Sequence, residues 1–170
     1  LSLFLREAEA LLGVRHDAVV YCNDLLTGED GRVHLVMELV EGRTLSDLVY
    51  ENGPLEEDEV WALGARIAAG LDAAHRRNVV HRDVSPDNII VQDNGDAVLL
   101  DFGSARQIIG DMTRGLTVIL KPGYAPIEQY AGDASLPQGP FTDIYALAAV
   151  MYFAIIKEAP PTSIAPPSAR

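Results

Sequence analysis

The sequence predicts an α+β fold on three observations. β-rich runs occur in two pairs, each pair separated by a turn signal, and stretches with helical periodicity lie before, between and after them. Hydrophobic residues make up 48% and charged residues 22% of the 170 residues, a balance typical of a globular chain that buries a core. The only cysteine, Cys22, excludes an intramolecular disulfide framework, so the fold must depend on packing.

The N-terminal part predicts one helix followed by a hairpin. Residues 3–12 place apolar side chains on one helical face, and Gly13 ends this helix. Residues 18–26 and 32–39 are rich in residues that favour strands, and the glycine-containing segment 27–31 separates them. We therefore expect two antiparallel strands after the first helix.

The middle of the chain predicts two helices and a second hairpin. Residues 44–50 indicate a short helix and residues 56–77 a long one, with acids in its first turn and bases in its last. Short strands at 89–91 and 97–100 flank the Asp-Asn-Gly-Asp turn at 93–96. The long helix has an apolar stripe at Val60, Leu63, Ile67, Leu71 and Ala74.

The last third of the chain predicts a long loop, a buried helix and a tail. Residues 102–141 carry many Gly and Pro residues with little periodicity, and loops of this length are usually functional or disordered. A helix is expected at 143–157. The tail at 158–170 contains four prolines, and we expect it to be frayed.

The charge balance bears on partners and location. The chain carries 25 acidic and 13 basic residues, a net charge of −12, whereas binding nucleic acid requires clustered Lys and Arg. The first residues do not resemble a signal segment, and the apolar run 144–156 is too short to span a bilayer. We expect no nucleic-acid partner, no membrane segment in this chain and, with one cysteine that fits a reducing compartment, a cytoplasmic location.

Two motifs lie on either side of the second hairpin. Residues 81–88, His-Arg-Asp-Val-Ser-Pro-Asp-Asn, match the pattern H-R-D-x-x-x-x-N. Residues 101–103, Asp-Phe-Gly, follow the last predicted strand of the hairpin. Together the motifs resemble the catalytic core of protein kinases, specifically bacterial Ser/Thr kinases.

The resemblance implies Mg²⁺-dependent transfer of the ATP γ-phosphate to a Ser or Thr hydroxyl of a protein substrate. Asp83 would orient the hydroxyl and accept its proton, because this reaction needs a carboxylate there. Asn88 and Asp101 would supply the hard oxygen ligands that Mg²⁺ prefers. His81 and Phe102 would have structural roles.

The resemblance extends toward the N-terminus. Glu7, in a segment similar to the family's C-helix, would pair with the lysine that anchors ATP. Met37 would be the gatekeeper, and the backbone groups of Glu38 and Val40 would face adenine. Ile90 would pack beneath the adenine ring.

The resemblance also extends toward the C-terminus. The family's A-P-E motif reads Pro-Ile-Glu here, and only Glu128 is carried over. Asp143 matches the aspartate of the buried F-helix, which holds the catalytic-loop backbone. Arg82 marks kinases in which an arginine pairs with a phosphorylated loop residue, and Thr117 aligns with the usual phosphosite, with Thr113 as its nearest competitor.

One departure from the family pattern concerns a lysine. Ser/Thr kinases normally place a lysine two residues after the catalytic aspartate, and a threonine of the substrate-binding segment contacts both. Here Ser85 occupies the lysine position and Lys121 aligns with the threonine. We hypothesise that Lys121 is the catalytic lysine, with Ser85 hydrogen-bonding to it or to Asp83.

The resemblance implies a truncated protein kinase-like fold over residues 1–157. Residues 1–37 would be the remainder of an N-lobe, with the C-helix and two strands, 38–42 the hinge, and 43–157 a helical C-lobe up to the F-helix. We expect the glycine-rich loop and the strand lysine to precede this segment and further C-lobe helices to follow it. The segment alone would then be inactive, whereas the intact protein would be a kinase.

Two alternative functions are open. A pseudokinase, acting as a binding or scaffold module, is supported by Ser85 in place of lysine. The retained Asp83, Asn88 and Asp101 argue against it.

The second alternative is a small-molecule phosphotransferase of the aminoglycoside or choline kinase type. Such enzymes share the Asp-to-Asn spacing and a later metal aspartate. Phe102-Gly103, the Pro-Gly-Tyr-Ala-Pro segment at 122–126 and Glu128 favour a protein substrate instead.

Overall fold

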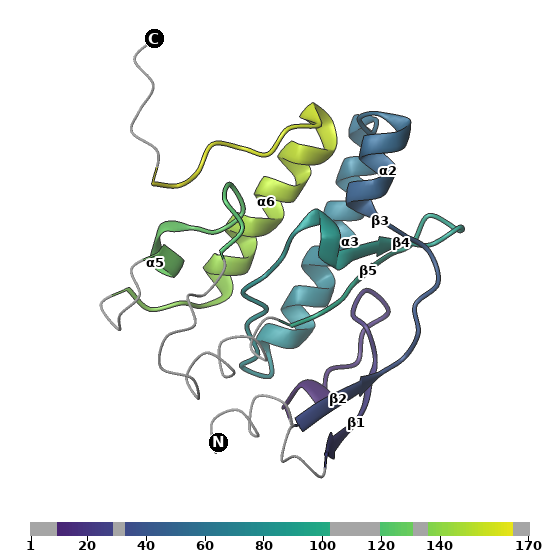
Figure 1. The fold of residues 1–170 in the computed structure, drawn as a ribbon, viewed down its shortest axis with the longest axis vertical. Helices are drawn as coiled ribbons and strands as arrows, with labels where there is room; N and C mark the ends of the chain where they lie inside the picture. The colour runs from purple at the N-terminus through teal and green to yellow at the C-terminus, as the bar shows by residue number, and fades with distance from the viewer. Residues whose placement is uncertain (1–9, 29–32, 103–119, 131–135, 165–170) are drawn as a thin grey trace.

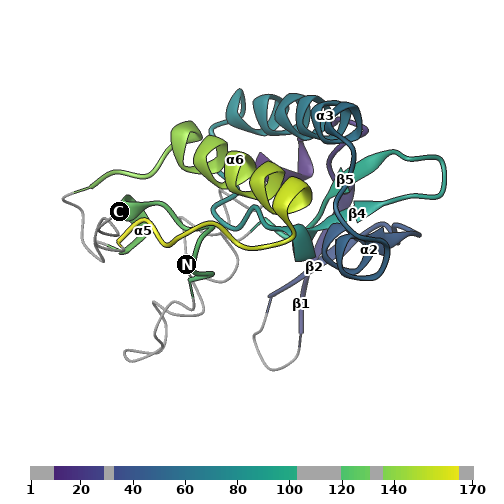
Figure 2. The same cartoon turned by 90° about the horizontal axis from the view of Figure 1, so that it is seen from above.

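Two small antiparallel sheets and two long helices organise the chain, as the computed structural model shows (Figure 1). The structure describes residues 10–28, 33–102, 120–130 and 136–164. Within these ranges the fold is α+β, as the sequence predicts. The two-stranded sheet projects from one side of the molecule, and the long helices lie together away from it (Figures 1 and 2).

The first sheet is the hairpin of β1 (Cys22–Thr27) and β2 (Val33–Met37). Its register runs from Cys22 opposite Met37 to Thr27 opposite Val33, with an irregularity between Cys22 and Asp24. The expected strand at 18–26 therefore begins later, at Cys22.

Residues 18–20 instead pair with Leu99, in an isolated parallel bridge at Val19. The Val20 amide donates to the Leu99 carbonyl, and the Leu99 amide donates to the Ala18 carbonyl, each at 2.9 Å. Because their partner lies far along the chain, the β-rich pattern at 18–26 could not show that the run divides between two sheets.

The second sheet has the order β3-β4-β5. Strand β3 (Arg43–Thr44) pairs with β4 (Ile89–Val91), which pairs with β5 (Ala97–Leu99) through the predicted turn. The 3₁₀ helix η1 (Pro86–Asn88) leads directly into β4, so the first motif of the sequence ends where this sheet begins.

Capping interactions set the start of each main helix. Helix α2 (Leu45–Asn52) starts after Thr44, whose hydroxyl accepts a hydrogen bond from the Asp47 amide at 3.0 Å. Helix α3 (Glu57–His75) starts with the Glu56–Glu59 capping box and has acids in its first turn.

The helical boundaries differ from the prediction by one to three residues. Helix α3 ends at His75, before Arg77, because Asn78 turns the chain with a φ of 58°. Helix α6 (Pro140–Ile156) starts three residues before the predicted 143, with a proline in its first turn, where the missing N–H costs no hydrogen bond. The four-residue helix α5 (Ile127–Tyr130) was not predicted, because a single turn has no readable periodicity.

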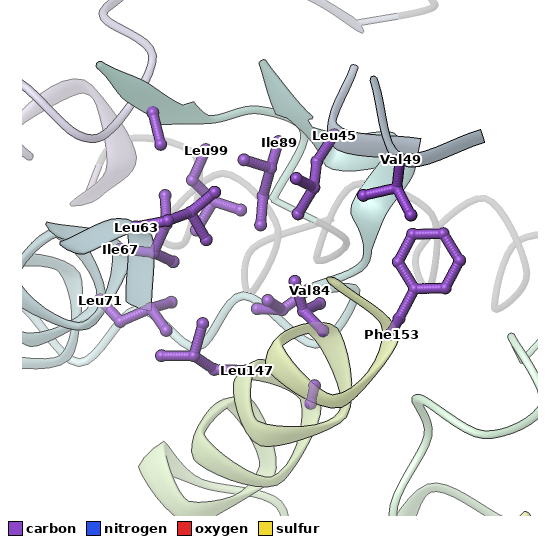
Figure 3. Packing of buried hydrophobic residues seen from close by; sticks show 13 residues of the cluster. Leu45, Val49, Leu63, Ile67, Leu71, Val84, Ile89, Leu99, Leu147 and Phe153 are labelled. Atoms are coloured by element: carbon purple, nitrogen blue, oxygen red, sulfur yellow. The ribbon is translucent and has the colours of Figure 1, made fainter. Parts of the chain in front are cut away.

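The main core lies between α2, α3, α6 and the β4–β5 hairpin (Figure 3). Helices α3 and α6 pack side by side, and the predicted stripe of α3 faces inward. Burying each large aliphatic side chain contributes about 1.5–3 kcal/mol. The labelled core residues are Leu45, Val49, Leu63, Ile67, Leu71, Val84, Ile89, Leu99, Leu147 and Phe153.

The first part of the predicted tail, residues 158–164, packs on the chain instead of fraying. The Ser163 hydroxyl donates to the Ala125 carbonyl at 2.9 Å. Gly123 has a φ of 87°, and a methyl group added there would lie 2.5 Å from the Pro160 carbonyl oxygen. The close contact with 122–125 explains why these prolines are held.

No helix within the described ranges is both long enough and apolar enough to cross a membrane.

Candidate active site

The predicted catalytic loop, residues 81–88, connects the region after α3 to β4. Arg82 has a φ of 66°, and Asp101, after β5, has a φ of 47°. Residues other than glycine rarely adopt this left-handed conformation, which costs of order 1–3 kcal/mol unless the surroundings enforce it. Of the four described residues other than glycine with positive φ, Arg82 and Asp101 lie in the two motifs that the sequence singles out.

Asp143 of α6 holds the catalytic-loop backbone. Its Oδ2 accepts from the His81 amide and its Oδ1 from the Arg82 amide, each at 2.8 Å, and His75 Nε2 lies 2.7 Å from Oδ2. The carboxyl group is fully buried near the N-terminal end of α6, where the helix dipole favours a negative charge. Three hydrogen-bond partners satisfy this buried carboxyl group, which fixes the conformation of the loop.

His81 connects the catalytic loop to the Asp101 motif. Its Nε2 lies 2.7 Å from the Leu100 carbonyl and must donate to it, whereas Nδ1 accepts from the Asp83 amide at 3.2 Å. These bonds require a neutral ring, and complete burial lowers the pKa of His81 accordingly. The ring also packs against Phe102, with centroids 4.5 Å apart.

Phe102 belongs to a second buried cluster, which reaches residues 10–14 and the first hairpin. Leu11 and Cys22 lie in the same cluster. Burial raises the pKa of Cys22 to about 11, while Arg15 opposes this shift and Glu38 and Asp101 add to it. The thiol is therefore held neutral within the packing.

The side chain of Asn88 fixes the orientation of Asp83. Asn88 Nδ2 donates to the Asp83 carbonyl at 2.7 Å and to the Asp83 carboxylate at 3.0 Å. Only the amide oxygen of Asn88 can then serve as a metal ligand.

Asn88 and Asp101 lie at the same end of the β4–β5 hairpin. The Leu100 amide donates to the Asn88 carbonyl at 2.8 Å, so Asp101 follows the residue that is paired with Asn88. One carboxylate and one amide oxygen suit Mg²⁺, which keeps several waters and completes its shell with substrate phosphates. Among the described residues, no group of three or more His, Cys, Asp or Glu side chains is placed to hold a metal ion. Asn88 and Asp101 are therefore the two candidate metal ligands.

Lys121 reaches the catalytic loop from the segment after the Asp101 motif. Its Nζ donates to Ser85 Oγ at 2.7 Å and lies 3.1 Å from Asp87 Oδ2. Ser85 is fully buried, and the Lys121 side chain is 29% exposed. The contact between Ser85 and Lys121 that the aligned positions predict is therefore present.

Glu128 and Gln129 of α5 fasten the same region to α6 and to the loop. Glu128 Oε1 accepts from the Thr142 hydroxyl at 2.9 Å, and this hydroxyl accepts from the Gly139 amide at the start of α6. Gln129 Nε2 donates to the Arg82 carbonyl at 2.7 Å. Both peptide groups of Arg82 are thus held by residues from the last third of the chain.

The predicted hinge, 38–42, connects β2 to β3. Met37 ends β2, and the Glu38 amide donates to the Tyr21 carbonyl at 2.9 Å. Gly42 has a φ of 147°, and a methyl group there would lie 2.6 Å from Ile90 Cγ2. Gly42, at the end of the hinge, therefore lies against Ile90 of β4, the residue expected to lie beneath adenine. Val40, within the hinge, is half-buried.

Two predicted residues, Glu7 and Thr117, lie outside the described residues. Three contacting residues were missed by the sequence prediction, namely His75, Asp87 and Gln129. Asp87 lies within the H-R-D-x-x-x-x-N motif, which could have drawn attention to it. His75 and Gln129 carry no local signal, because their partners are far away in the sequence.

Comparison with known proteins agrees with this geometry. The family model described as "Protein kinase domain" matches residues 2–166. Serine/threonine-protein kinase PknL of Mycobacterium tuberculosis is 38% identical over 154 residues, which cover 89% of this chain and 37% of PknL. Serine/threonine-protein kinase F of Synechocystis sp. is 39% identical over 163 residues, covering 87% of this chain and 32% of that protein.

Solved structures show the same likeness. The structure titled "PpkA-294 apo form" superposes with a TM-score of 0.79 at 36% identity, covering 96% of this chain and 57% of that one. Rad53 in complex with AMP-PNP superposes with a TM-score of 0.74 at 22% identity, covering 94% of this chain and 39% of that one, and this match shows the fold alone. The chain spans about a third of the length of these two curated relatives. By the match over residues 2–166, the two motifs and the shared fold, the chain belongs to the protein kinase domain family.

Proposed function

We propose that the protein containing this chain is a Ser/Thr protein kinase that transfers the γ-phosphate of ATP to a protein hydroxyl. The observation that carries the proposal is the Asp83 carboxylate, oriented by Asn88 at the hairpin end that also carries Asp101. The relatives named serine/threonine-protein kinases support the same activity.

In the proposed reaction Asp83 accepts the proton of the substrate hydroxyl as the hydroxyl oxygen forms a bond to the γ-phosphorus. The bond from that phosphorus to the bridging oxygen breaks, and ADP leaves with its electron pair. Mg²⁺, when bound, supplies positive charge to the phosphates, and the Asn88 amide oxygen and the Asp101 carboxylate would hold it. Asn88 also keeps the Asp83 carboxylate in one orientation, so no reorganisation is needed during transfer.

Binding of ATP is assigned to the hinge side of the site. The backbone groups of Glu38 and Val40 would face adenine, with Met37 as gatekeeper and Ile90 beneath the ring. Glu7 would pair with the lysine that anchors the phosphates. The contact of Gly42 with Ile90 supports this arrangement, because it brings the hinge next to β4.

The structural roles proposed for four residues follow from their contacts. Asp143 and His81 hold the loop, Phe102 packs against His81, and Glu128 fastens the segment before α6. Arg82 would respond to phosphorylation of Thr117 by pairing with the phosphate. We place the enzyme in the cytoplasm, where ATP is available and a lone thiol such as Cys22 stays reduced.

The test is the Asp83→Asn variant of the intact protein, assayed by transfer of labelled γ-phosphate to itself and to a protein substrate. We expect turnover to fall by about 10²–10⁴-fold, the usual contribution of a positioned base. Asp72→Asn is the matched control, because the Asp72 side chain is exposed on α3, where it pairs with Arg76. The label should be found on Ser or Thr.

Three results would contradict the proposal. Full activity of Asp83→Asn would remove Asp83 from the reaction. Nucleotide binding without transfer in the unaltered protein would indicate a pseudokinase. Label on an added aminoglycoside or choline, with none on protein, would indicate a small-molecule phosphotransferase.

A further inference from the structure

The catalytic loop lacks a positive charge where the reaction needs one. Residues 83–88 contain two aspartates, Asp83 and Asp87, and no lysine or arginine. Asp101 adds a third carboxylate at the hairpin end, and the ATP phosphates add further negative charge. Phosphoryl transfer depends on cations placed at the transferring group, so a cationic side chain that acts there together with Mg²⁺ would come from another segment.

Lys121 supplies a cation at this position. Its ammonium group lies 2.7 Å from the hydroxyl of Ser85, two residues after Asp83, and 3.1 Å from the Asp87 carboxylate. The carbonyl of Lys121 accepts from the Tyr124 and Ala125 amides, each at 3.1 Å, so a turn fixes the backbone from which the side chain extends. Both ends of the lysine are therefore positioned.

The contact with Ser85 distinguishes this arrangement from an ordinary surface ion pair. The Asp87 side chain is 60% exposed, and a pair of that kind contributes about 0–1 kcal/mol. The shorter bond goes to the fully buried Ser85, which draws the ammonium group onto the loop instead of into solvent. An ammonium group has three N–H donors, and Ser85 and Asp87 take two, which leaves one for a phosphoryl oxygen.

We propose that Lys121 is the catalytic residue that contacts the γ-phosphoryl group, delivered by the activation segment (residues 101–128) in place of a lysine in the catalytic loop. Ser85 positions the ammonium group, and Asp87 holds it before ATP binds. This inference rests on the proposed function. In this arrangement the position of the ammonium group depends on the activation segment, because the turn at 121–125 must form for Lys121 to reach Ser85.

The first test compares Lys121→Met with Lys157→Met in the intact protein. These are the only two lysines of the chain, and Lys157 lies at the end of α6, where its Nζ donates to the Tyr50 carbonyl at 3.0 Å. We expect Lys121→Met to lower kcat by about a hundredfold or more, as loss of one transition-state contact does, and Lys157→Met to change it little. Equal kcat values for Lys121→Met and the unaltered enzyme would overturn the proposal.

The exchange Ser85→Lys with Lys121→Thr tests position as well as charge. It restores an ammonium group to the loop and removes the side chain that would clash with it. We expect it to recover about tenfold or more of the kcat lost in Lys121→Met. A folded exchange variant with no recovery would count against the proposal.

A binding measurement separates this inference from the proposed function. Calorimetric titration with ATP and with ADP gives the ratio of the two Kd values, which reports contacts to the γ-phosphate without any turnover. Lys121→Met should reduce the preference for ATP over ADP about tenfold, and Lys157→Met should leave it unchanged. An unchanged preference in Lys121→Met overturns the inference even if the kinase activity is real. An altered preference supports the inference even if the phosphoryl acceptor is not a protein.

Discussion

Replacing Asp143 by asparagine should reveal how much of the active site depends on one buried carboxylate. The substitution keeps the shape of the side chain but exchanges one oxygen for an NH₂ group. Oδ2 faces the His81 amide and His75, and Oδ1 faces the Arg82 amide. Whichever way the new amide turns, a donor meets a donor on one side.

The magnitude follows from the better of the two orientations. If the new amide oxygen faces His81 and His75, Asp143→Asn loses the charge-assisted bond to the Arg82 amide, which contributes about 1.5–3 kcal/mol. The Arg82 N–H then faces another donor, the new NH₂ group, which costs about 1–3 kcal/mol. Arg82 also needs support for its φ of 66°. Together these contributions lower the free energy of unfolding by about 2.5–6 kcal/mol, and we expect kcat to fall as well, because the loop relaxes.

Urea denaturation followed by circular dichroism, together with the phosphotransfer assay on the intact protein, measures both effects. Asp72→Asn makes the same substitution at an exposed ion pair with Arg76 and should cost less than about 1 kcal/mol. If Asp143→Asn loses no more stability than Asp72→Asn, the buried carboxylate does not hold the loop, and the argument from its hydrogen bonds is wrong.

Two further predictions concern pH. Burial lowers the pKa of His81 below its usual value near 6.5, so the unfolded chain takes up a proton at a higher pH than the folded chain. The stability that His81 contributes is therefore complete above pH 6.5 and is lost as the pH falls below it. Stability curves of the unaltered protein and His81→Gln should therefore converge below pH 6.5, and parallel curves would refute this. Burial raises the pKa of Cys22 from about 9 to about 11, so its contribution is complete below pH 9 and declines as the pH rises toward 11. The stability difference between the unaltered protein and Cys22→Ala should narrow over that range, and a constant difference would show that the thiol does not titrate there.

Local signals in the sequence predicted most of the regular structure. The stripe of α3, the turn between β4 and β5 and the short helix α2 depend on neighbours within a few residues, and the bounds of these elements lie within two residues of the predicted ones. The division of the run at 18–26 was missed because its cause is pairing with Leu99, which no local pattern contains. Likewise, residues 158–164 pack on residues 122–125 through the close approach of Pro160 to Gly123 and the hydrogen bond from the Ser163 hydroxyl. The amino-acid composition of the tail predicts neither contact.

The candidate site was predictable to the extent that its chemistry is concentrated in motifs. Asp83 and Asn88 belong to one motif, and the structure brings them into contact. Lys121 and Ser85 were paired by two departures from the family pattern, and their contact is present. The hydrogen bond from Gln129 to Arg82 has no such signature, because a glutamine next to a motif is an ordinary surface residue unless the fold is known.

The anchors of the catalytic loop all follow it in the sequence. Asp143 lies 62 and 61 residues from the two amides that it holds, Gln129 lies 47 residues from Arg82, and Lys121 lies 36 residues from Ser85. Contacts of such separation carry the entropic cost of closing a long loop of chain. The unusual backbone of Arg82 and the cation at Ser85 therefore depend on how Lys121, Gln129 and Asp143 are held. Any change that loosens these contacts must act on the catalytic loop as well, even when the substituted residue never contacts a substrate.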